Sequence, residues 1–281
     1  MKQIGILGFP LGHTLSPKIH EAGFKELNLD IKFEVWEVKP ENLNEKVKLL
    51  KTDDVLGFCV TLPHKYSIIS LIDELDESAK EMNAVNWVVN SNGRLKGYNT
   101  DWIGFKESLI YYGKQIADQE CLILGAGGSA KAICMALIKE NAKKIYIHNR
   151  TEKNVINFIN NFKQINKDIQ IINSDKLNNK DFISTLDLII NTTSVGMQGG
   201  PDPNNSPINT DNINKRALCY DLVYSPEITP FIEQAKNNKV EAIGGLTMLV
   251  FQAIKGFELV TGEKAPVIKM LEAVGITKDE D

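Results

Sequence analysis

The sequence has few of the features that mark disulfide-rich, zinc-binding or membrane-spanning proteins. Its 281 residues include four cysteines, far apart and without CxxC or Cys/His ligand spacing. This pattern predicts reduced thiols in a cytoplasmic protein, with neither disulfides nor a bound metal. No apolar run approaches the roughly 18 residues of a membrane-spanning helix, and glycines and a proline interrupt the N-terminus before a signal-peptide core could form. We therefore expect no membrane partner. The cysteines are Cys59, Cys121, Cys134 and Cys219.

An excess of positive charge is also absent. The 32 Lys and Arg residues are outnumbered by 36 Asp and Glu residues, a formal net charge of −4. No overall positive field therefore attracts nucleic acid or anionic lipid, and any anionic ligand must be held by local groups. The remaining composition, 43% hydrophobic and 24% charged, is that of a globular protein, and the length allows two domains of medium size.

Short apolar runs alternate with helical patterns in the first hundred residues, which predicts an α/β domain. Ser16-Pro17 marks a helix start, where we expect the serine hydroxyl to cap the helix and proline to occupy its first turn. Asn92-Gly93 joins two strands in the manner of a hairpin. Strands are predicted at 4–8, 33–38, 55–61, 84–90 and 93–99, and helices at 16–29, 41–50 and from Asp101 to Gly113.

A second α/β unit begins at Glu120. CLILGAGGSAKAICMALIKENAKKIYIHNRT combines a strand, a glycine turn, a helix and a second strand in about 30 residues, the length of a nucleotide-binding βαβ unit. The alternation continues afterwards, which favours a doubly wound parallel sheet. Later strands are predicted near 169–172, 186–190, 217–222 and 239–243, with helices near 152–164, 228–238 and after Gly244-Gly245.

The glycine turn has the composition of a pyrophosphate site. Gly125 permits a tight turn, Gly127 and Gly128 let a phosphate approach the helix N-terminus, and Ala130 allows close helix packing. Glycines of an α/β turn can also be purely architectural, so the second strand matters. At the end of that strand, Arg150 stands where an NAD-binding unit carries a carboxylate. The arginine favours binding of the 2′-phosphate of NADP and argues against a methyltransferase.

Polar residues follow several apolar strands of the first unit, in VTLPHK and GYNTD. Ligands of open α/β sheets bind at the carboxyl ends of strands. A lysine placed there is partly desolvated and can be oriented by a carboxylate, so Lys65 and Asp101 form a plausible proton-transfer pair. The alternatives are a surface lysine and a helix-capping aspartate. His64 we assign to loop packing or a local hydrogen bond.

Taken together, these segments resemble the shikimate dehydrogenase family from Ile4 to about Gly262. The matching motifs, in order, are GFPLGHTLSPKIH, VTLPHK, AVNWV, GYNTDWIGF, GAGGSAKA, NRT, NTTSVGM, YDLVYSPEITP and GGLTMLVFQA. The resemblance implies an NADPH-dependent reduction of 3-dehydroshikimate to shikimate in aromatic amino-acid biosynthesis. It also implies a substrate domain at 1–101, completed by helices at 246–281, and a Rossmann-type NADP domain at 102–245.

The resemblance assigns roles to the matching residues. Lys65 would be the general acid, and Asp101 would orient it and bind a ring hydroxyl. Thr14, Ser16 and Tyr224 would hold the substrate carboxylate. Thr61, Asn86 and Gln252 would contact the ring hydroxyls. Gly125, Ala126, Gly127, Gly128 and Ala130 would bind the pyrophosphate, Asn149, Arg150 and Thr151 the 2′-phosphate, and Thr193, Met197, Val223, Gly245 and Met248 the nicotinamide.

Four positions depart from the family pattern. Thr14 stands where serine is usual, Cys59 where asparagine is usual, and Asn83 and Trp87 where glycine and threonine are usual. A changed pocket could admit quinate, which carries an extra hydroxyl, or a related cyclitol, because one methyl or hydroxyl can discriminate substrates by as little as roughly 1–3 kcal/mol. The alternatives are thus a quinate or dual dehydrogenase and a non-catalytic NADP-binding sensor. Monomer and homodimer both remain open.

Overall fold

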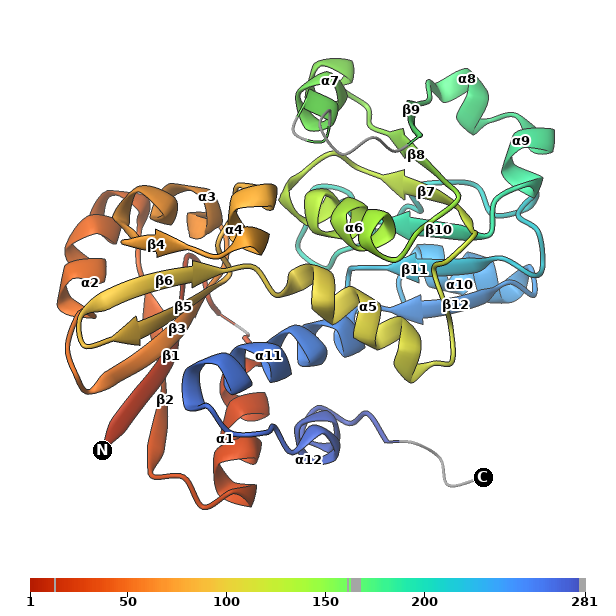
Figure 1. Cartoon of the computed structure of the whole chain (residues 1–281). Helices are drawn as coiled ribbons and strands as arrows, with labels where there is room; N and C mark the ends of the chain where they lie inside the picture. Colours follow the sequence, from red (N-terminus) through yellow and green to blue (C-terminus); the bar gives the residue numbers. More distant parts are fainter. Residues whose placement is uncertain (13, 161, 163–167, 278–281) are drawn as a thin grey trace. The chain divides into compact units, whose positions relative to one another are not determined.

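Two compact units make up the chain in a computed structural model that describes residues 1–12, 14–160, 162 and 168–277 (Figure 1). The first unit comprises residues 1–104 and 249–281, and the second comprises 105–248. Residues 278–281 of the predicted C-terminal segment lie outside the described residues. Each unit has its own six-stranded sheet, so the expected α/β class is confirmed.

The first unit is built on a mixed sheet. Its strands lie in the order β2-β1-β3-β5-β6-β4. β1 pairs in parallel with β2 and β3, whereas β5 runs antiparallel to both β3 and β6. The strands are β1 (Lys2–Gly8), β2 (Ile31–Glu37), β3 (Val55–Val60), β4 (Glu74–Leu75), β5 (Trp87–Ser91) and β6 (Arg94–Tyr98).

Helices cover the first sheet and enclose its core. One apolar cluster joins Leu43 and Val47 of α2 to Phe58 and Val88 of the sheet. α11 packs on the sheet through Val260, which would contact any side chain added at Gly57 of β3. The helices are α1 (Ser16–Glu26), α2 (Leu43–Leu49), α3 (His64–Ser67), α4 (Glu77–Met82), α11 (Leu246–Thr261) and α12 (Val267–Glu272), with 3-10 turns at Pro40–Asn42 and Ile68–Leu71.

The second unit is built on a parallel sheet in the order β12-β11-β10-β7-β8-β9 (Figure 1). The chain starts in the middle at β7, moves outward to β9, and then returns to build β10 to β12 on the other side. This doubly wound order places a topological switch between β7 and β10, where such sheets bind ligands. The strands are β7 (Glu120–Leu124), β8 (Lys144–His148), β9 (Ile169–Ile171), β10 (Leu188–Asn191), β11 (Leu218–Asp221) and β12 (Glu241–Gly244).

The helices of the second unit complete the predicted alternation. α6 is buried almost throughout, because small and apolar side chains such as Ala132, Ile133 and Ala136 let it pack closely. Among the described residues, no helix is both long and apolar enough to cross a membrane. The helices are α5 (Asp101–Tyr111), which begins in the first unit and continues in the second from Phe105, α6 (Gly128–Lys139), α7 (Glu152–Asn160), α8 (Ser174–Leu177), α9 (Lys180–Ser184) and α10 (Pro230–Asn237).

Two local expectations need comment. The Asn92-Gly93 turn is confirmed, since both residues have positive φ angles, 53° and 82°. α1 begins at Ser16, yet the prediction that Ser16 caps it is wrong. Ser16 is already helical, whereas a cap must precede the helix; its own N–H is instead accepted by Thr14 Oγ1 at 3.3 Å. The two-residue strand β4 was too short to leave a periodic signal.

Candidate active site

Lys65 and Asp101 lie together in the first unit. Lys65 belongs to α3, directly after β3, and Asp101 is the first residue of α5. The Lys65 Nζ donates to Asp101 Oδ2 at 2.6 Å, and the two side chains are 27% and 13% exposed. The ammonium group is therefore held by a carboxylate, and both side chains remain partly exposed. A lysine oriented in this way by a carboxylate is an arrangement that can support proton transfer to a ligand.

The loops that carry this pair are fixed by buried hydrogen bonds. The backbone carbonyl of Lys65 accepts the Val85 N–H at 2.7 Å. Asn99, which is buried, donates to the Ala84 carbonyl at 3.1 Å and accepts the Asp101 N–H at 3.1 Å. Because these bonds connect both loops to one short segment, Lys65 and Asp101 are held at a set separation.

Asn86 and Gln252 extend the network away from the lysine. Asn86 Nδ2 donates to Asp101 Oδ1 at 2.8 Å and to Gln252 Oε1 at 3.3 Å. Thr100 joins the same group, since its hydroxyl donates to the Gln252 backbone carbonyl at 3.0 Å. Four residues predicted for the site are thus brought into one network: Lys65, Asp101, Asn86 and Gln252.

Thr14 and Ser16 form a second polar pair at the start of α1. The Thr14 hydroxyl donates to Ser16 Oγ at 3.2 Å. Cys59 of β3 lies within interaction distance of Ser16, and burial raises the pKa of its thiol to about 12. Cys59 therefore presents a neutral thiol beside Ser16. Thr61, partly buried, follows the end of β3.

The structure explains the departure at Asn83 without reference to a ligand. Asn83 closes α4 in the left-handed conformation, with φ of 49°. Glycine adopts this conformation most readily and asparagine is the usual substitute. Asparagine therefore preserves the turn for which the family uses glycine.

His64 is held inside the first unit by a hydrogen bond to the backbone. It is buried, and its Nε2 lies 2.6 Å from the Val38 carbonyl, which can only accept a hydrogen bond. The Nε2 atom is accordingly the protonated one, and the ring attaches α3 to the end of β2. All four cysteines are free and buried, as predicted.

The predicted pyrophosphate turn connects β7 to α6 in the second unit. Gly125 has φ of 111°, and a Cβ there would lie 2.5 Å from Thr192 Oγ1. At Gly127 and Gly128, by contrast, a Cβ would meet nothing within 4 Å. Internal packing therefore does not require these two glycines, whereas a phosphate approaching the helix N-terminus would. The first turn of α6 carries no acidic residue that would repel an anion.

The remaining residues predicted to bind the cofactor all follow carboxyl ends of strands in this sheet, so the parallel topology gathers them at one edge. Tyr224 belongs to the same unit, after β11, and its role toward a substrate carboxylate stays a prediction. Asn149, Arg150 and Thr151 follow β8, Thr193 and Met197 follow β10, Val223 follows β11, and Gly245 and Met248 follow β12.

A buried carboxylate that we did not predict organises this edge. Asp221, at the end of β11, accepts from Asn191 Nδ2 at 2.9 Å, from Thr229 Oγ1 at 2.6 Å and from the Val223 N–H at 3.0 Å. Asn191 in turn accepts from the Thr193 hydroxyl at 2.7 Å. Asp221 thus ties together the loops after β10 and β11. The available sequence signal was a lone carboxylate at the end of an apolar strand.

The Asp221 carboxyl also makes stability depend on pH. Burial raises its pKa from 3.8 to about 6. The folded state thus binds more protons than the unfolded state between these values, so this contribution is present below about pH 4 and lost as pH rises through about 6. Relative to Asp221→Asn, the free energy of unfolding of the wild type should fall by at most about 3 kcal/mol between pH 4 and 7. Denaturant unfolding of both proteins across this range measures the difference, and a difference independent of pH would contradict the assignment.

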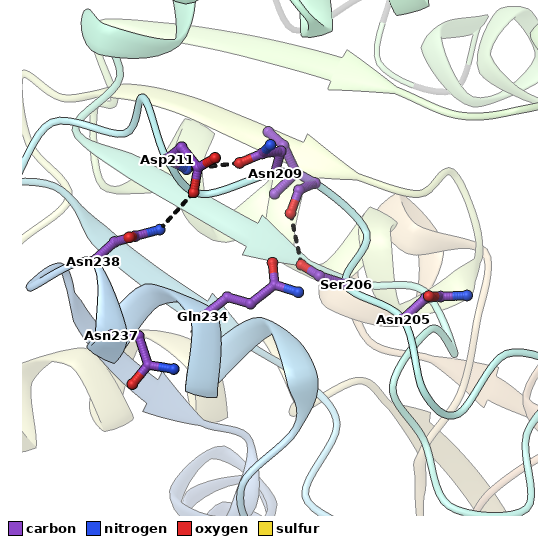
Figure 2. Close-up of a pocket in the computed structure, with 8 residues that line it drawn as sticks. Asn205, Ser206, Asn209, Asp211, Gln234, Asn237 and Asn238 are labelled. Carbon is purple, nitrogen blue, oxygen red and sulfur yellow. Dashed lines mark hydrogen bonds between the residues drawn. The ribbon is translucent and has the colours of Figure 1, made fainter.

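A separate polar hollow of about 550 Å³ lies in the second unit (Figure 2). Its amide and hydroxyl side chains largely bond within the protein: Asn238 donates to Asp211 Oδ1 at 3.1 Å, and Ser206 donates to the Ile208 carbonyl at 2.6 Å. None of the predicted site residues lines it. We therefore place the active site elsewhere.

A doubly wound sheet with a glycine turn suited to pyrophosphate, together with a lysine–aspartate pair, is the combination expected of a nucleotide-dependent oxidoreductase. Comparison with known proteins identifies the family. Residues 6–88 match the shikimate dehydrogenase substrate binding domain, and residues 110–248 match shikimate / quinate 5-dehydrogenase. The chain belongs to the shikimate dehydrogenase family, as its motifs predicted.

Individual relatives match over nearly the whole chain. The chain is 42% identical over 266 residues to shikimate dehydrogenase (NADP(+)) of Caldanaerobacter subterraneus subsp. tengcongensis, covering 93% of this chain and 92% of that one. It is 39% identical to the Nitrosopumilus maritimus protein of the same name, covering 97% and 98%. A solved shikimate 5-dehydrogenase from Thermus thermophilus, in complex with NADP(H) and shikimate, is similar with a TM-score of 0.86, 30% identity and coverage of 97% and 98%.

Proposed function

We propose that the chain catalyses the reversible, NADPH-dependent reduction of 3-dehydroshikimate to shikimate, a step in aromatic amino-acid biosynthesis. The observation that carries the proposal is the 2.6 Å contact between Lys65 and Asp101 within the Asn86–Gln252 network. Family membership supports the identity of the substrate, and the T. thermophilus protein binds both shikimate and NADP(H).

Lys65 acts as the general acid. Its ammonium group donates a proton to the carbonyl oxygen of the substrate as that oxygen becomes a hydroxyl, and the neutral amine accepts the proton in the reverse direction. Asp101 orients the ammonium through Oδ2, while Oδ1 is held by Asn86. The carboxylate is thereby kept in one orientation and is available to a ring hydroxyl.

Substrate recognition is assigned to residues 1–101 with 246–281. Thr14 and Ser16 supply hydroxyls for the carboxylate, and their mutual hydrogen bond sets the distance between them. Thr61, Asn86 and Gln252 contact the ring hydroxyls.

Cofactor binding is assigned to residues 102–245, together with Met248. NADPH, when bound, supplies the hydride. The turn at Gly125 to Ala130 accepts the pyrophosphate, and the guanidinium of Arg150 binds the 2′-phosphate with charge-assisted hydrogen bonds. We assign the enzyme to the cytoplasm, because four buried free thiols suit a reducing compartment.

Purified protein should oxidise shikimate in the presence of NADP⁺, and the increase in NADPH fluorescence measures the rate. We expect kcat/KM for shikimate to exceed that for quinate by about tenfold or more, the discrimination a single hydroxyl can provide. A higher value for quinate would favour the quinate dehydrogenase that Thr14 and Cys59 leave open. Turnover of neither, with NADP⁺ still bound, would instead indicate a non-catalytic sensor.

A further inference from the structure

Trp87 contacts the proposed substrate site from within the core. It belongs to β5 and is fully buried, with 0% exposure. Its indole Nε1 donates to Gln252 Oε1 at 3.2 Å. A buried indole N–H needs an acceptor, and here the acceptor is a side chain that we assign to substrate binding.

The indole has little freedom to move. Gly256 lies one turn after Gln252 on α11, and a Cβ at that position would clash with the indole ring of Trp87. On another side, the His20 ring packs against Trp87 with centroids 5.3 Å apart. The donor atom is therefore held at one place beside Gln252. A glycine inside a long helix was the sequence signal for this close approach.

Two groups that can only donate determine how the neighbouring amides are oriented. The backbone N–H of Thr100 donates to Asn86 Oδ1 at 2.7 Å, so Asn86 must present its Nδ2 to Gln252. Trp87 Nε1 is also only a donor. Asn86 Nδ2 and Trp87 Nε1 therefore both donate to Gln252 Oε1. The amide nitrogen of Gln252 faces away from them.

The orientation leaves Gln252 as a donor toward a ligand. One hydrogen of its Nε2 is donated to the Leu249 carbonyl at 2.8 Å. No acceptor for the second hydrogen is found in the described part of the chain. Gln252 is partly exposed, and this second hydrogen is the group that we assign to a ligand.

We propose that Trp87 is a positioning residue that holds Gln252 with its amide nitrogen toward the substrate, so that Gln252 donates to a ring hydroxyl oxygen. The inference rests on the proposed function, because that function assigns Gln252 to the substrate. Trp87 itself does not contact the substrate and acts through Gln252.

Trp87→Phe removes the donor and keeps most of the ring. We expect KM for shikimate to rise about 2- to 10-fold, the effect of one neutral hydrogen bond, with kcat within about twofold because ground and transition states lose the same contact. Trp36→Phe is the matched control. Trp36 belongs to β2 and packs on Phe58 and Lys46, so its replacement should leave KM unchanged.

The Gln252→Ala background separates positioning from packing. If Trp87 acts through Gln252, adding Trp87→Phe to Gln252→Ala should change KM by less than about twofold. An equal rise in both backgrounds, or no rise in the single variant, would overturn the proposal. Failure of the wild type to oxidise shikimate would instead refute the proposed function.

NMR spectra of the wild type and of Gln252→Ala test the Trp87–Gln252 hydrogen bond even if Trp87→Phe does not fold. The chain has three tryptophans, Trp36, Trp87 and Trp102, so the variants Trp36→Phe and Trp102→Phe assign the indole N–H resonances of the wild type. Gln252→Ala should shift the Trp87 resonance upfield, because its acceptor is lost, and leave that of Trp36 in place. An unchanged Trp87 resonance would contradict the hydrogen bond.

Discussion

Replacing Lys65 with alanine should lower turnover about 10²- to 10⁴-fold, the usual contribution of a general acid, which corresponds to roughly 3–5 kcal/mol of activation free energy. The structure gives the physical reason. Lys65 Nζ lies 2.6 Å from the Asp101 carboxylate and is held there by loops with buried hydrogen bonds. If Lys65 is the general acid, the alanine variant lacks the group that protonates the substrate oxygen.

The measurement compares kcat for shikimate oxidation with NADP⁺ affinity by fluorescence titration. NADP⁺ affinity should be preserved, since the residues assigned to the cofactor are in the other unit. Lys51→Ala is a suitable control, because Lys51 also forms an ion pair, with Asp73 at 2.9 Å, among residues that we do not assign to the site. Near-wild-type turnover of Lys65→Ala would remove Lys65 from the mechanism.

Arg150→Ala should weaken NADP⁺ binding about 10- to 150-fold, or roughly 1.5–3 kcal/mol, the range for hydrogen bonds to charged groups. Arg150 is exposed and follows the carboxyl end of β8, the strand next to the glycine turn of β7. The guanidinium matches the two acceptor oxygens of a phosphate. NAD⁺ lacks that phosphate, so its affinity should barely change.

Titrations of both dinucleotides against wild type and variant measure this selectivity. Arg216→Ala provides the matched control. Arg216 is an exposed arginine of the same unit, but it precedes β11 and so lies at the amino end of the sheet. Its loss should leave NADP⁺ and NAD⁺ affinities unaltered. Equal weakening of NADP⁺ and NAD⁺ by Arg150→Ala would show that Arg150 does not bind the 2′-phosphate.

The elements with strong local signals were predictable. The apolar strand and small-residue helix on either side of Gly125 to Ala130 identified the βαβ unit, because their periodicity and glycine spacing are properties of neighbouring residues. The Asn92-Gly93 hairpin was predictable for the same reason. The capping role predicted for Ser16 was wrong, since a shift of one residue at a helix start changes which side chain can reach the free N–H groups.

The candidate site was predictable as a set of loops but not as a network. Asp221 was missed because a carboxylate at a strand end has no distinctive spacing, and its importance depends on Asn191 and Thr229, which come from other segments. Trp87 was noticed only as a departure from the family pattern. Its link to Gln252 depends on helix α11 lying against β5, which Gly256 permits.

The sequence by itself determined the two α/β units, the glycine turn between β7 and α6, and the family, since each depends on short ordered patterns of residues. Only the tertiary structure decided which distant polar groups meet: Lys65 with Asp101, 36 residues apart, and Trp87 with Gln252, 165 residues apart. Such pairs depend on strand register and helix packing, because a shift of one residue turns a strand side chain to the opposite face of the sheet.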